Sequence, residues 1–364
     1  MSGALSPAER LAWLRLARTE TVGAVSFRRL LARFGEPGAA LAALPEIARR
    51  AGRGASLQIP SAVEAEAELA DGEAMGAKLL LSADADFPAA LAALDPPPPL
   101  LWVLGQTDLL DRRAAAVVGA RIASAQGRRF ARGLAADLGA AGLVVVSGLA
   151  RGIDAAAHEG ALASGTVAVL GGGLADIYPP ENEPLYEVIA ARGCLVSESA
   201  PRRRAQARDF PRRNRLISGL SLAVVVVEAE LRSGSLITAR MALEQGREVL
   251  AVPGSPLDPR CRGCNDLIRQ GAGVCEEADD VLRAIEGVTG FRAPPSPRFA
   301  PDADADISEA LRERLFVLLS PTPVAIDELA RLAAAPPGQV FAALVELSLA
   351  GRAELHPGAT AALP

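Results

Sequence analysis

Residues 201–239 read PRRRAQARDFPRRNRLISGLSLAVVVVEAELRSGSLITA, and this stretch decides how the fold is interpreted. Residues 202–215 contain seven arginines and one acid, Asp209, so this segment carries a net charge of +6. Residues 222–227 follow as an apolar, β-branched run, which predicts a buried strand. The strand ends at Glu228, and a Ser-Gly-Ser turn at 233–235 opens a helix. A basic segment, a parallel strand and a small-residue turn in this order are typical of an anion site in an α/β sheet.

The composition favours a cytoplasmic chain of two or three domains. Half of the 364 residues are apolar, which allows a large core, and the net charge of −5 argues against a basic surface over the whole protein. Residues 1–20 have a helix-capping pattern at Ser6–Glu9 but lack the basic start and apolar core of a signal peptide. No apolar run approaches the roughly 18 residues of a membrane span, so we expect no membrane partner.

The four cysteines favour reduced thiols over a metal centre. Cys261 and Cys264 form a C-x-x-C pair, and Cys275 follows eleven residues on, a pattern compatible with zinc. A zinc site usually needs a fourth Cys or His, and neither His158 nor His356 is nearby in the sequence. We therefore expect no metal ion and no cofactor.

Residues 1–75 are expected to form a small helical domain, because apolar residues recur there at helical spacing. Within it, TVGAVSFRRLLARFGEP (21–37) has the shape of a helix-hairpin-helix, a motif that can hold a DNA backbone. Val25 stands where a second glycine is expected, so a structural helical domain is favoured over a DNA-gripping hairpin.

Residues 76–288 alternate between apolar strands and helices. We expect strands at 78–82, 114–118, 143–147, 167–170, 194–197, 222–227 and 248–252. We expect helices between them at 125–141, 154–164, 182–192, 213–219 and 234–246. This alternation predicts an α/β domain with a Rossmann-like, doubly wound parallel sheet.

The C-terminal part divides into a linker and a winged helix. Residues 289–306 are a linker by composition. Residues 307–364 give three amphipathic helices and a candidate β-wing, which is the order of a winged-helix domain. The third helix, 337–351, contains no arginine or lysine, although a DNA-reading helix needs hydrogen-bond donors. A protein-contact or structural role is therefore favoured for this domain.

Every expected strand of the sheet ends in a turn of small residues. These turns are Gly119-Ala120-Arg121, residues 147–154 with Gly148 and Arg151, Gly171-Gly172-Gly173, Ser197-Glu198 and Ser233-Gly234-Ser235. The carboxyl ends of parallel strands meet at one edge, where helix N-termini and arginines favour an anion. Tight strand–helix packing explains one or two of the glycines but not five such turns beside arginines.

The anion is expected to be a polymer. A dinucleotide site needs G-x-G-x-x-G, but the first turn, VVGARIAS, has one glycine, and no Walker A sequence is present. A mononucleotide or a phosphate chain fits this better than NAD does. The arginine segment is too long for one small ligand and suits a polyanion. Phe210 either stacks on an unpaired base or anchors the segment together with Pro211.

No complete catalytic set is visible. Asp154 and His158 are four residues apart on one helix, but no nucleophile is paired with them, and a packing role is favoured for His158. Glu198, Glu228 and Glu230 are candidates either for metal ligands or for orienting the arginines. We therefore do not expect an enzyme.

Five segments resemble the DprA family, also called Smf. They are VVSGLARGIDAAAH (145–158), VAVLGGGLADIYPPEN (167–182), FPRRNRLISGLS (210–221), VVVVEAELRSGSLITARMALEQGREVLAVPGS (224–255) and GCNDLIRQGA (263–272). The resemblance covers about residues 75–288 and, in outline, the flanking domains. It implies a Rossmann-like protein that binds single-stranded DNA cooperatively as a homodimer, protects incoming strands in natural transformation and loads RecA onto them. The family is not known for a catalytic activity.

The resemblance also assigns residues. Arg121 is expected to hold a phosphate, Arg208 or Arg204 supplies the second basic group, and the expected homodimer surface is on residues 265–270. The whole expected DNA site is Gly119, Ala120, Arg121, Gly148, Arg151, Arg204, Arg208, Phe210, Asn214, Arg215, Gly234 and Ser235. The expected dimer residues are Asn265, Leu267, Ile268 and Gln270.

Two other functions compete with this interpretation. One is a Rossmann-like enzyme on a nucleotide monophosphate, similar to phosphoribohydrolases, but GGGLADIYPP (171–180) does not supply their P-G-G-x-G-T motif. The other is a winged-helix regulator that senses a nucleotide, and the lack of basic residues in 337–351 counts against it.

Overall fold

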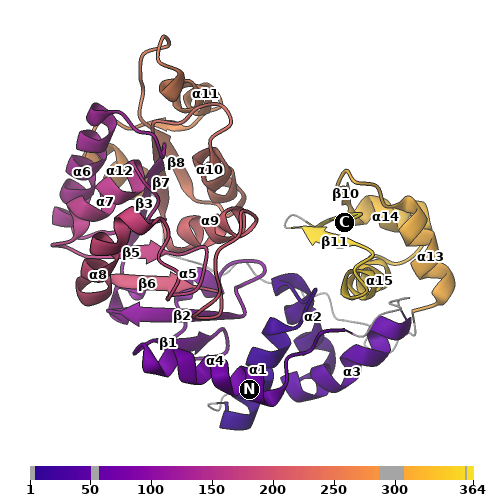
Figure 1. The fold of residues 1–364 in the computed structure, drawn as a ribbon. Coiled ribbons are helices and arrows are strands. Elements are labelled where there is room, and N and C mark those ends of the chain that lie inside the picture. The colour runs from indigo at the N-terminus through magenta and orange to yellow at the C-terminus, as the bar shows by residue number, and fades with distance from the viewer. Residues whose placement is uncertain (1–4, 51–56, 287–306, 357–358) are drawn as a thin grey trace.

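The computed structural model describes residues 5–50, 57–286, 307–356 and 359–364. A helical N-terminal part, a central sheet covered by helices and a small C-terminal part follow one another along the chain (Figure 1). The linker expected at 289–306 lies outside the described residues.

The N-terminal part consists of four helices, which are α1 (Pro7–Arg18), α2 (Ala24–Phe34), α3 (Pro37–Arg50) and α4 (Ala62–Ala74). Ser6 and Glu9 form the expected capping box of α1, each side chain bonding the other's backbone amide. The rings of Trp13 and Phe27 pack 5.0 Å apart between α1 and α2. Arg18 pairs with Glu68 and donates to the carbonyl of Glu198, so this part is fixed to the central sheet.

The central sheet has nine strands in the order β1-β2-β6-β5-β4-β3-β7-β8-β9. The strands are β1 (Lys78–Leu81), β2 (Leu100–Gly105), β3 (Ala114–Gly119), β4 (Val144–Ser147), β5 (Thr166–Val169), β6 (Cys194–Ser197), β7 (Ala223–Val227), β8 (Glu248–Ala251) and β9 (Gly273–Val274). Neighbours from β6 to β9 are parallel, as expected, whereas β2 is antiparallel to both β1 and β6. The sheet is therefore mixed, and β2 and the short edge strand β9 have no counterparts among the expected strands.

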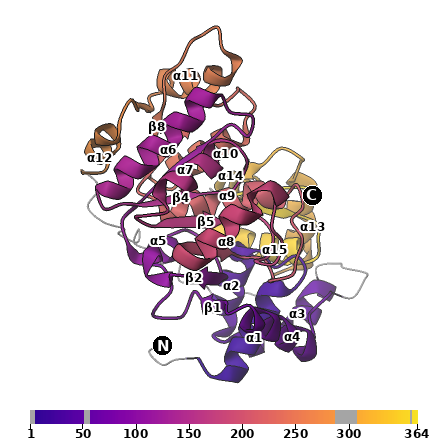
Figure 2. The same cartoon turned by 60° about the vertical axis from the view of Figure 1, so that its left-hand side comes forward.

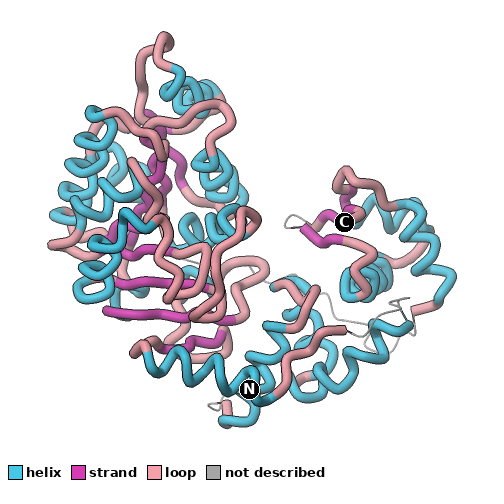
Figure 3. Tube along the Cα trace, viewed as in Figure 1, coloured by secondary structure: helices cyan, strands magenta, loops and turns pink. Residues whose placement is uncertain are grey.

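Helices cover both faces of the sheet, which confirms the doubly wound arrangement (Figures 2 and 3). One face carries α6 (Ala125–Ala140), α7 (Ile153–Ala161), α8 (Glu183–Arg192) and α12 (Ala278–Glu286). The other carries α5 (Ala89–Ala92), α9 (Asp209–Leu220), α10 (Gly234–Glu244) and α11 (Arg262–Arg269). Short 3-10 turns lie at Thr107–Asp111, Pro180–Asn182 and Pro259–Cys261.

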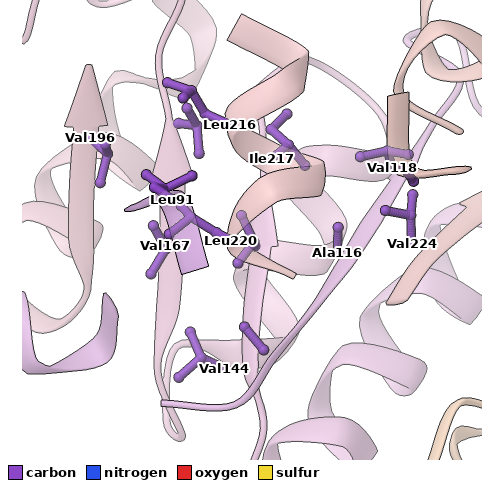
Figure 4. Close-up of a cluster of buried hydrophobic side chains, with 14 of the residues drawn as sticks. Leu91, Ala116, Val118, Val144, Val167, Val196, Leu216, Ile217, Leu220 and Val224 are labelled. Atoms are coloured by element: carbon purple, nitrogen blue, oxygen red, sulfur yellow. The ribbon is translucent and has the colours of Figure 1, made fainter. Parts of the chain in front are cut away.

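Helix α9 is anchored by its apolar face. Leu216, Ile217 and Leu220 are at most 3% exposed and pack on strand residues such as Val167 and Val224 (Figure 4). The helix begins at Asp209, four residues before the expected start, and the Asp209 carboxylate accepts from the amide of Gln206 (2.8 Å) and pairs with Arg203. Proline is compatible with a first helical turn, so Pro211 does not prevent this early start.

The C-terminal part is a winged helix. It contains α13 (Glu309–Leu318), β10 (Val324–Ala325), α14 (Ile326–Ala333), α15 (Pro337–Leu349), β11 (Glu354–His356) and β12 (Thr360–Ala362), with strand order β10-β12-β11. Within the described ranges no single helix is long and apolar enough to cross a membrane. Only α14 and α15 together reach that length, across a bend of 107°.

The winged helix is seated on the N-terminal helices through α15 (Figure 1). The Arg29 guanidinium lies 3.6 Å from the centre of the Phe341 ring, and Val345 and Leu349 are buried in the N-terminal apolar cluster. Glu346, 6% exposed, accepts from Arg33 (3.4 Å) and from Arg312 of its own domain (2.8 Å). Helix α15 therefore forms the contact between the winged helix and the N-terminal helices of the same chain.

Replacing Glu346 with Ala should loosen this contact. The substitution leaves the buried Arg312 guanidinium without its carboxylate, and removing one partner of a buried ion pair costs about 3 kcal/mol or more. We expect faster hydrogen exchange in α2 and α15, measured by mass spectrometry. Glu313→Ala is the control, since Glu313 is 58% exposed. Equal exchange in both variants would contradict the role of Glu346.

Candidate nucleic-acid interface

The expected site lies at the carboxyl edge of the sheet, where the strand order reverses between β3 and β7. Gly119 ends β3 there, and a Cβ at this position would lie 1.9 Å from the carbonyl oxygen of Val227. Only glycine allows this close approach, which brings the Gly119-Ala120-Arg121 turn beside the turn that follows β7. The position of Arg121 at this edge therefore depends on backbone packing.

Carboxylates of the protein already bind backbone amides beside the starts of α6 and α7 at this edge. Glu228 accepts from the backbone amide of Ser124 (2.8 Å) and from its hydroxyl at the start of α6. Asp154, in the first turn of α7, accepts from the amides of Gly148 (3.1 Å) and Ala150 (3.4 Å) in the turn before the helix. The structure differs here from the expectation of amides open to a ligand, so the charge available to an anion resides in arginine side chains.

The seven arginines of residues 202–215 fall into two groups. Four are held by the protein itself: Arg202 by Asp71 (2.6 Å), Arg203 by Asp209 (2.9 Å), Arg215 by Glu198 (2.5 Å), and Arg213 by the carbonyls of Gly148 and Val169. Arg204, Arg208 and Arg212 are exposed, and none has a hydrogen bond or ion pair to any residue that the structure describes. Three of the seven arginines therefore have no protein partner in the described part of the chain, and Arg202, 66% exposed in its pair with Asp71, is held only weakly.

Arg213 is a structural member of this group. It is 7% exposed and donates to Gly148 O (2.7 Å) and Val169 O, so it ties α9 to the ends of β4 and β5. Burial lowers the pKa of Arg213 to about 10, which leaves it charged at neutral pH. Burial also raises the pKa of the neighbouring Asp154 carboxyl, and the positive charge of Arg213 opposes that rise.

Sequence reasoning counted Arg213 with the basic surface. Its spacing carries a signal that was overlooked: Arg213 precedes Leu216 and Ile217 by three and four residues, which places it on the apolar face of α9.

His158 is fully buried and has the expected packing role. Its Nδ1 bonds Thr166 Oγ1 (2.7 Å), and because that hydroxyl donates to Val145 O, Nδ1 carries the proton. Its Nε2 accepts from the amide of Leu149 (3.3 Å). Burial and the nearby Arg213 lower the pKa of His158 to about 3, so the ring is neutral.

An aromatic pair lies beside Arg121. Phe210, partly exposed, packs on Gly171, and its ring centre lies 5.4 Å from the Arg121 guanidinium carbon, within cation–π range. The ring centre of Tyr178 lies 5.6 Å from that of Phe210. Tyr178 was missed by sequence reasoning, although it lies within the loop 171–182 that joins the sheet edge to α8.

The remaining expected site residues border this group. Asn214 donates to the carbonyl of Gly234 (3.3 Å), so α9 is joined to the start of α10, where Ser233 caps the helix and Ser235 is buried. Arg151 is exposed and pairs with Glu181 (2.5 Å). Both side chains are more than half exposed, so this pair is weak and open to exchange for a phosphate.

Three family models match the chain, one for each part. Residues 78–286 match DNA recombination-mediator protein A, residues 7–70 match the DprA-like N-terminal HHH domain, and residues 299–359 match the DprA winged helix domain. The chain belongs to the DprA family. DprA membership confirms the resemblance seen in the five sequence segments, and the HHH match identifies the N-terminal helices as the helix-hairpin-helix type.

Named DprA relatives extend over most of the chain. Protein Smf of Escherichia coli (strain K12) is 40% identical over 284 residues, covering 77% of this chain and 76% of that protein. The putative DNA processing protein DprA of Mycobacterium tuberculosis (strain ATCC 25618 / H37Rv) is 43% identical over 266 residues, covering 72% and 68%.

Two solved DprA structures share the fold. The X-ray structure of DprA from Streptococcus pneumoniae has a TM-score of 0.64 and 34% identity, and the match covers 77% of this chain and 98% of that one. A structure from Helicobacter pylori, described for its single-stranded DNA binding mode, has a TM-score of 0.53 and 30% identity, covering 58% and 95%.

The DprA dimer residues expected on α11 are mostly turned inwards. The Asn265 side chain bonds the amide (3.2 Å) and carbonyl (2.9 Å) of Gly254. Leu267 and Ile268 are partly buried against the main core, whereas Gln270 is exposed. Next to them, the edge strand β9 carries Val274, which is 44% exposed.

The cysteines of this DprA chain are spread over separate contacts. Cys264 and Cys275 are buried with their thiols directed at Val226 O (3.5 Å) and Glu277 O (3.7 Å), and burial raises the pKa of both thiols to about 12. The described residues contain no group of three or more His, Cys, Asp or Glu placed to hold a metal ion.

The buried His158 predicts that this DprA chain loses stability in mild acid. The unfolded histidine gains a proton near pH 6.5, whereas the folded one does so only at about 3. Because the unfolded chain binds more protons in this interval, the free energy of unfolding falls as the pH is lowered, by up to about 1.4 kcal/mol per pH unit.

Urea unfolding followed by tryptophan fluorescence, between about pH 6.5 and 5, measures this slope. We expect His158→Gln to reduce the slope and His356→Gln, at a partly exposed position, to preserve it. An unchanged slope in His158→Gln would show that the pKa of His158 is the same in the folded and unfolded states.

Proposed function

We propose that this chain is a single-stranded DNA-binding recombination mediator that acts in the cytoplasm, protects incoming strands in natural transformation and loads RecA onto them. The observation that carries the binding step is the group of Arg204, Arg208 and Arg212, three exposed arginines without protein partners among the described residues. They lie along the segment that leads into α9, beside Arg121 and Phe210. The family and its structure described for single-stranded DNA binding support this proposal.

The arrangement suits a flexible polyanion better than a small phosphate ligand. Arg208 directly precedes α9 and Arg212 lies in its first turn, so both are placed by the start of this helix. Successive arginines along a surface segment match the repeated charges of a nucleic-acid backbone, and their binding releases counterions. Phe210 beside them offers a ring face that an unpaired base can reach.

The enzyme alternative is not favoured by any contact in the structure. A nucleotide-hydrolysing site needs carboxylates directed at the ligand. Here Glu228 bonds Ser124, Glu198 pairs with Arg215, and Asp154 bonds backbone amides. These acids organise the edge of the sheet, so we propose binding without catalysis at this site.

Replacing Arg208 with Ala should weaken binding to single-stranded DNA. Each phosphate contact contributes about 0.7 to the slope of log K against log salt for a single strand, so the slope should become shallower by roughly that amount. Arg121→Ala and Arg204→Ala should behave alike. Fluorescence anisotropy with labelled oligo-dT across a salt series measures the effect.

Arg203→Gln is the matched control, because Arg203 belongs to the same segment but pairs with the buried Asp209 carboxylate (2.9 Å), for which Gln keeps a hydrogen-bond donor. Its affinity and salt slope should stay close to those of the wild type. Equal losses in Arg203→Gln and Arg208→Ala would remove the distinction between held and available arginines.

We further propose that the chain forms a homodimer through the β9–α11 end of the sheet, with Gln270 and the exposed Val274 in the contact. An edge strand with an exposed apolar residue is a surface that a second chain can cover.

Val274→Asp should lower the mass measured by size-exclusion chromatography with light scattering to that of a monomer. Val317→Asp on α13, 79% exposed, should leave it unchanged, and a dimer in Val274→Asp would exclude this surface.

A further inference from the structure

Tyr178 is an exposed aromatic residue in a chain with few aromatic residues. The sequence has two Tyr, two Trp and nine Phe. Among the described residues, Tyr178 is the one large aromatic side chain that stays mostly exposed, at 50%. The described part of the chain offers no hydrogen-bond partner to its hydroxyl. Burial in the core therefore does not explain why a large ring occupies this position.

The loop that carries Tyr178 is fixed on both sides. Before it, the amide of Ala175 donates to Pro201 O (2.8 Å), and Asp176 accepts from the amide of Ala205 (2.7 Å). After it, the Asn182 side chain donates to Leu149 O (2.8 Å). The loop is thus bonded to the arginine segment and to the β4–α7 turn, so the ring is presented without a large cost of ordering.

The ring faces the arginine segment through Phe210. The two ring centres are 5.6 Å apart with an angle of 43° between the planes, which is a direct aromatic contact. No base fits between rings that already touch, so a base must stack on the outer face of Tyr178. Arg121 lies against Phe210, which places a phosphate-binding cation close to the aromatic pair.

We propose that Tyr178 is a nucleobase-stacking residue that extends the site beyond Phe210 along the DNA strand. The inference rests on the proposed single-strand binding and explains why the site prefers single-stranded DNA to duplex DNA. Base faces are open in a single strand and covered in a duplex, so a stacking residue favours the single strand. The arginines supply the salt-dependent part of the affinity, and Tyr178 supplies a part that depends on bases.

Paired ligands test this assignment. Binding of labelled oligo-dT and of an abasic deoxyribose-phosphate oligomer of equal length is measured for the wild type, Tyr178→Phe, Tyr178→Leu and Tyr178→Ala. We expect Tyr178→Ala and Tyr178→Leu to lose roughly 5- to 150-fold in affinity for oligo-dT, the range for one stacked base, with an unchanged salt slope. Affinity for the abasic oligomer should stay unchanged, and Tyr178→Phe should behave as the wild type.

Tyr178→Leu keeps an apolar cover over Phe210 but lacks a ring face, so it separates stacking from packing. Oligo-dT affinity at the wild-type level in Tyr178→Leu and Tyr178→Ala would overturn the inference, as would equal losses for oligo-dT and the abasic oligomer. In both cases, binding of oligo-dT by the wild type would still support the proposed single-strand binding function. A wild type that binds neither oligomer would overturn the proposed function as well.

Discussion

The hydrogen bonds of the buried Arg213 guanidinium are the interaction on which the carboxyl edge of the sheet depends. It joins the first turns of α9 to the carbonyls at the ends of β4 and β5, and no apolar side chain could satisfy these two oxygens. The apolar face of α9 fixes the helix against the sheet, and Arg213 fixes where its N-terminal end lies. The exposed arginines before and within that turn are thereby held at a defined place.

Acidic side chains of the protein hold the arginines and amides that shape this edge, and other arginines stay exposed for a ligand. Glu228 and Asp154 bind backbone amides beside the starts of α6 and α7. Asp209 and Glu198 pair with Arg203 and Arg215, which shape the edge. What remains for a ligand is a row of side-chain cations beside two rings, without a closed phosphate pocket built from backbone amides. A long, flexible anion with exposed bases matches that surface better than a nucleotide does.

Much of this could be predicted from the sequence, because alternation of apolar strands and helices is a local signal. The strands expected at 114–118 and 194–197 agree with β3 and β6 within one residue. Strand β2 was missed although LLWVLG is itself an apolar run, and its antiparallel pairing with the distant β6 is what no local pattern shows. The roles of Arg202 and Arg215 depend on acids distant in the sequence, Asp71 and Glu198, so side-chain charge alone could not assign them.

The most direct test of the account is the salt dependence of wild-type binding to oligo-dT and to the matching duplex. The four exposed arginines without an ion-pair partner among the described residues, Arg121, Arg204, Arg208 and Arg212, predict a slope of about −3 or steeper for log K against log salt on the single strand. The account also predicts clearly stronger binding to the single strand at each salt concentration. Equal affinity for both ligands, or a slope near zero, would contradict the central claim that this edge of the sheet binds single-stranded DNA.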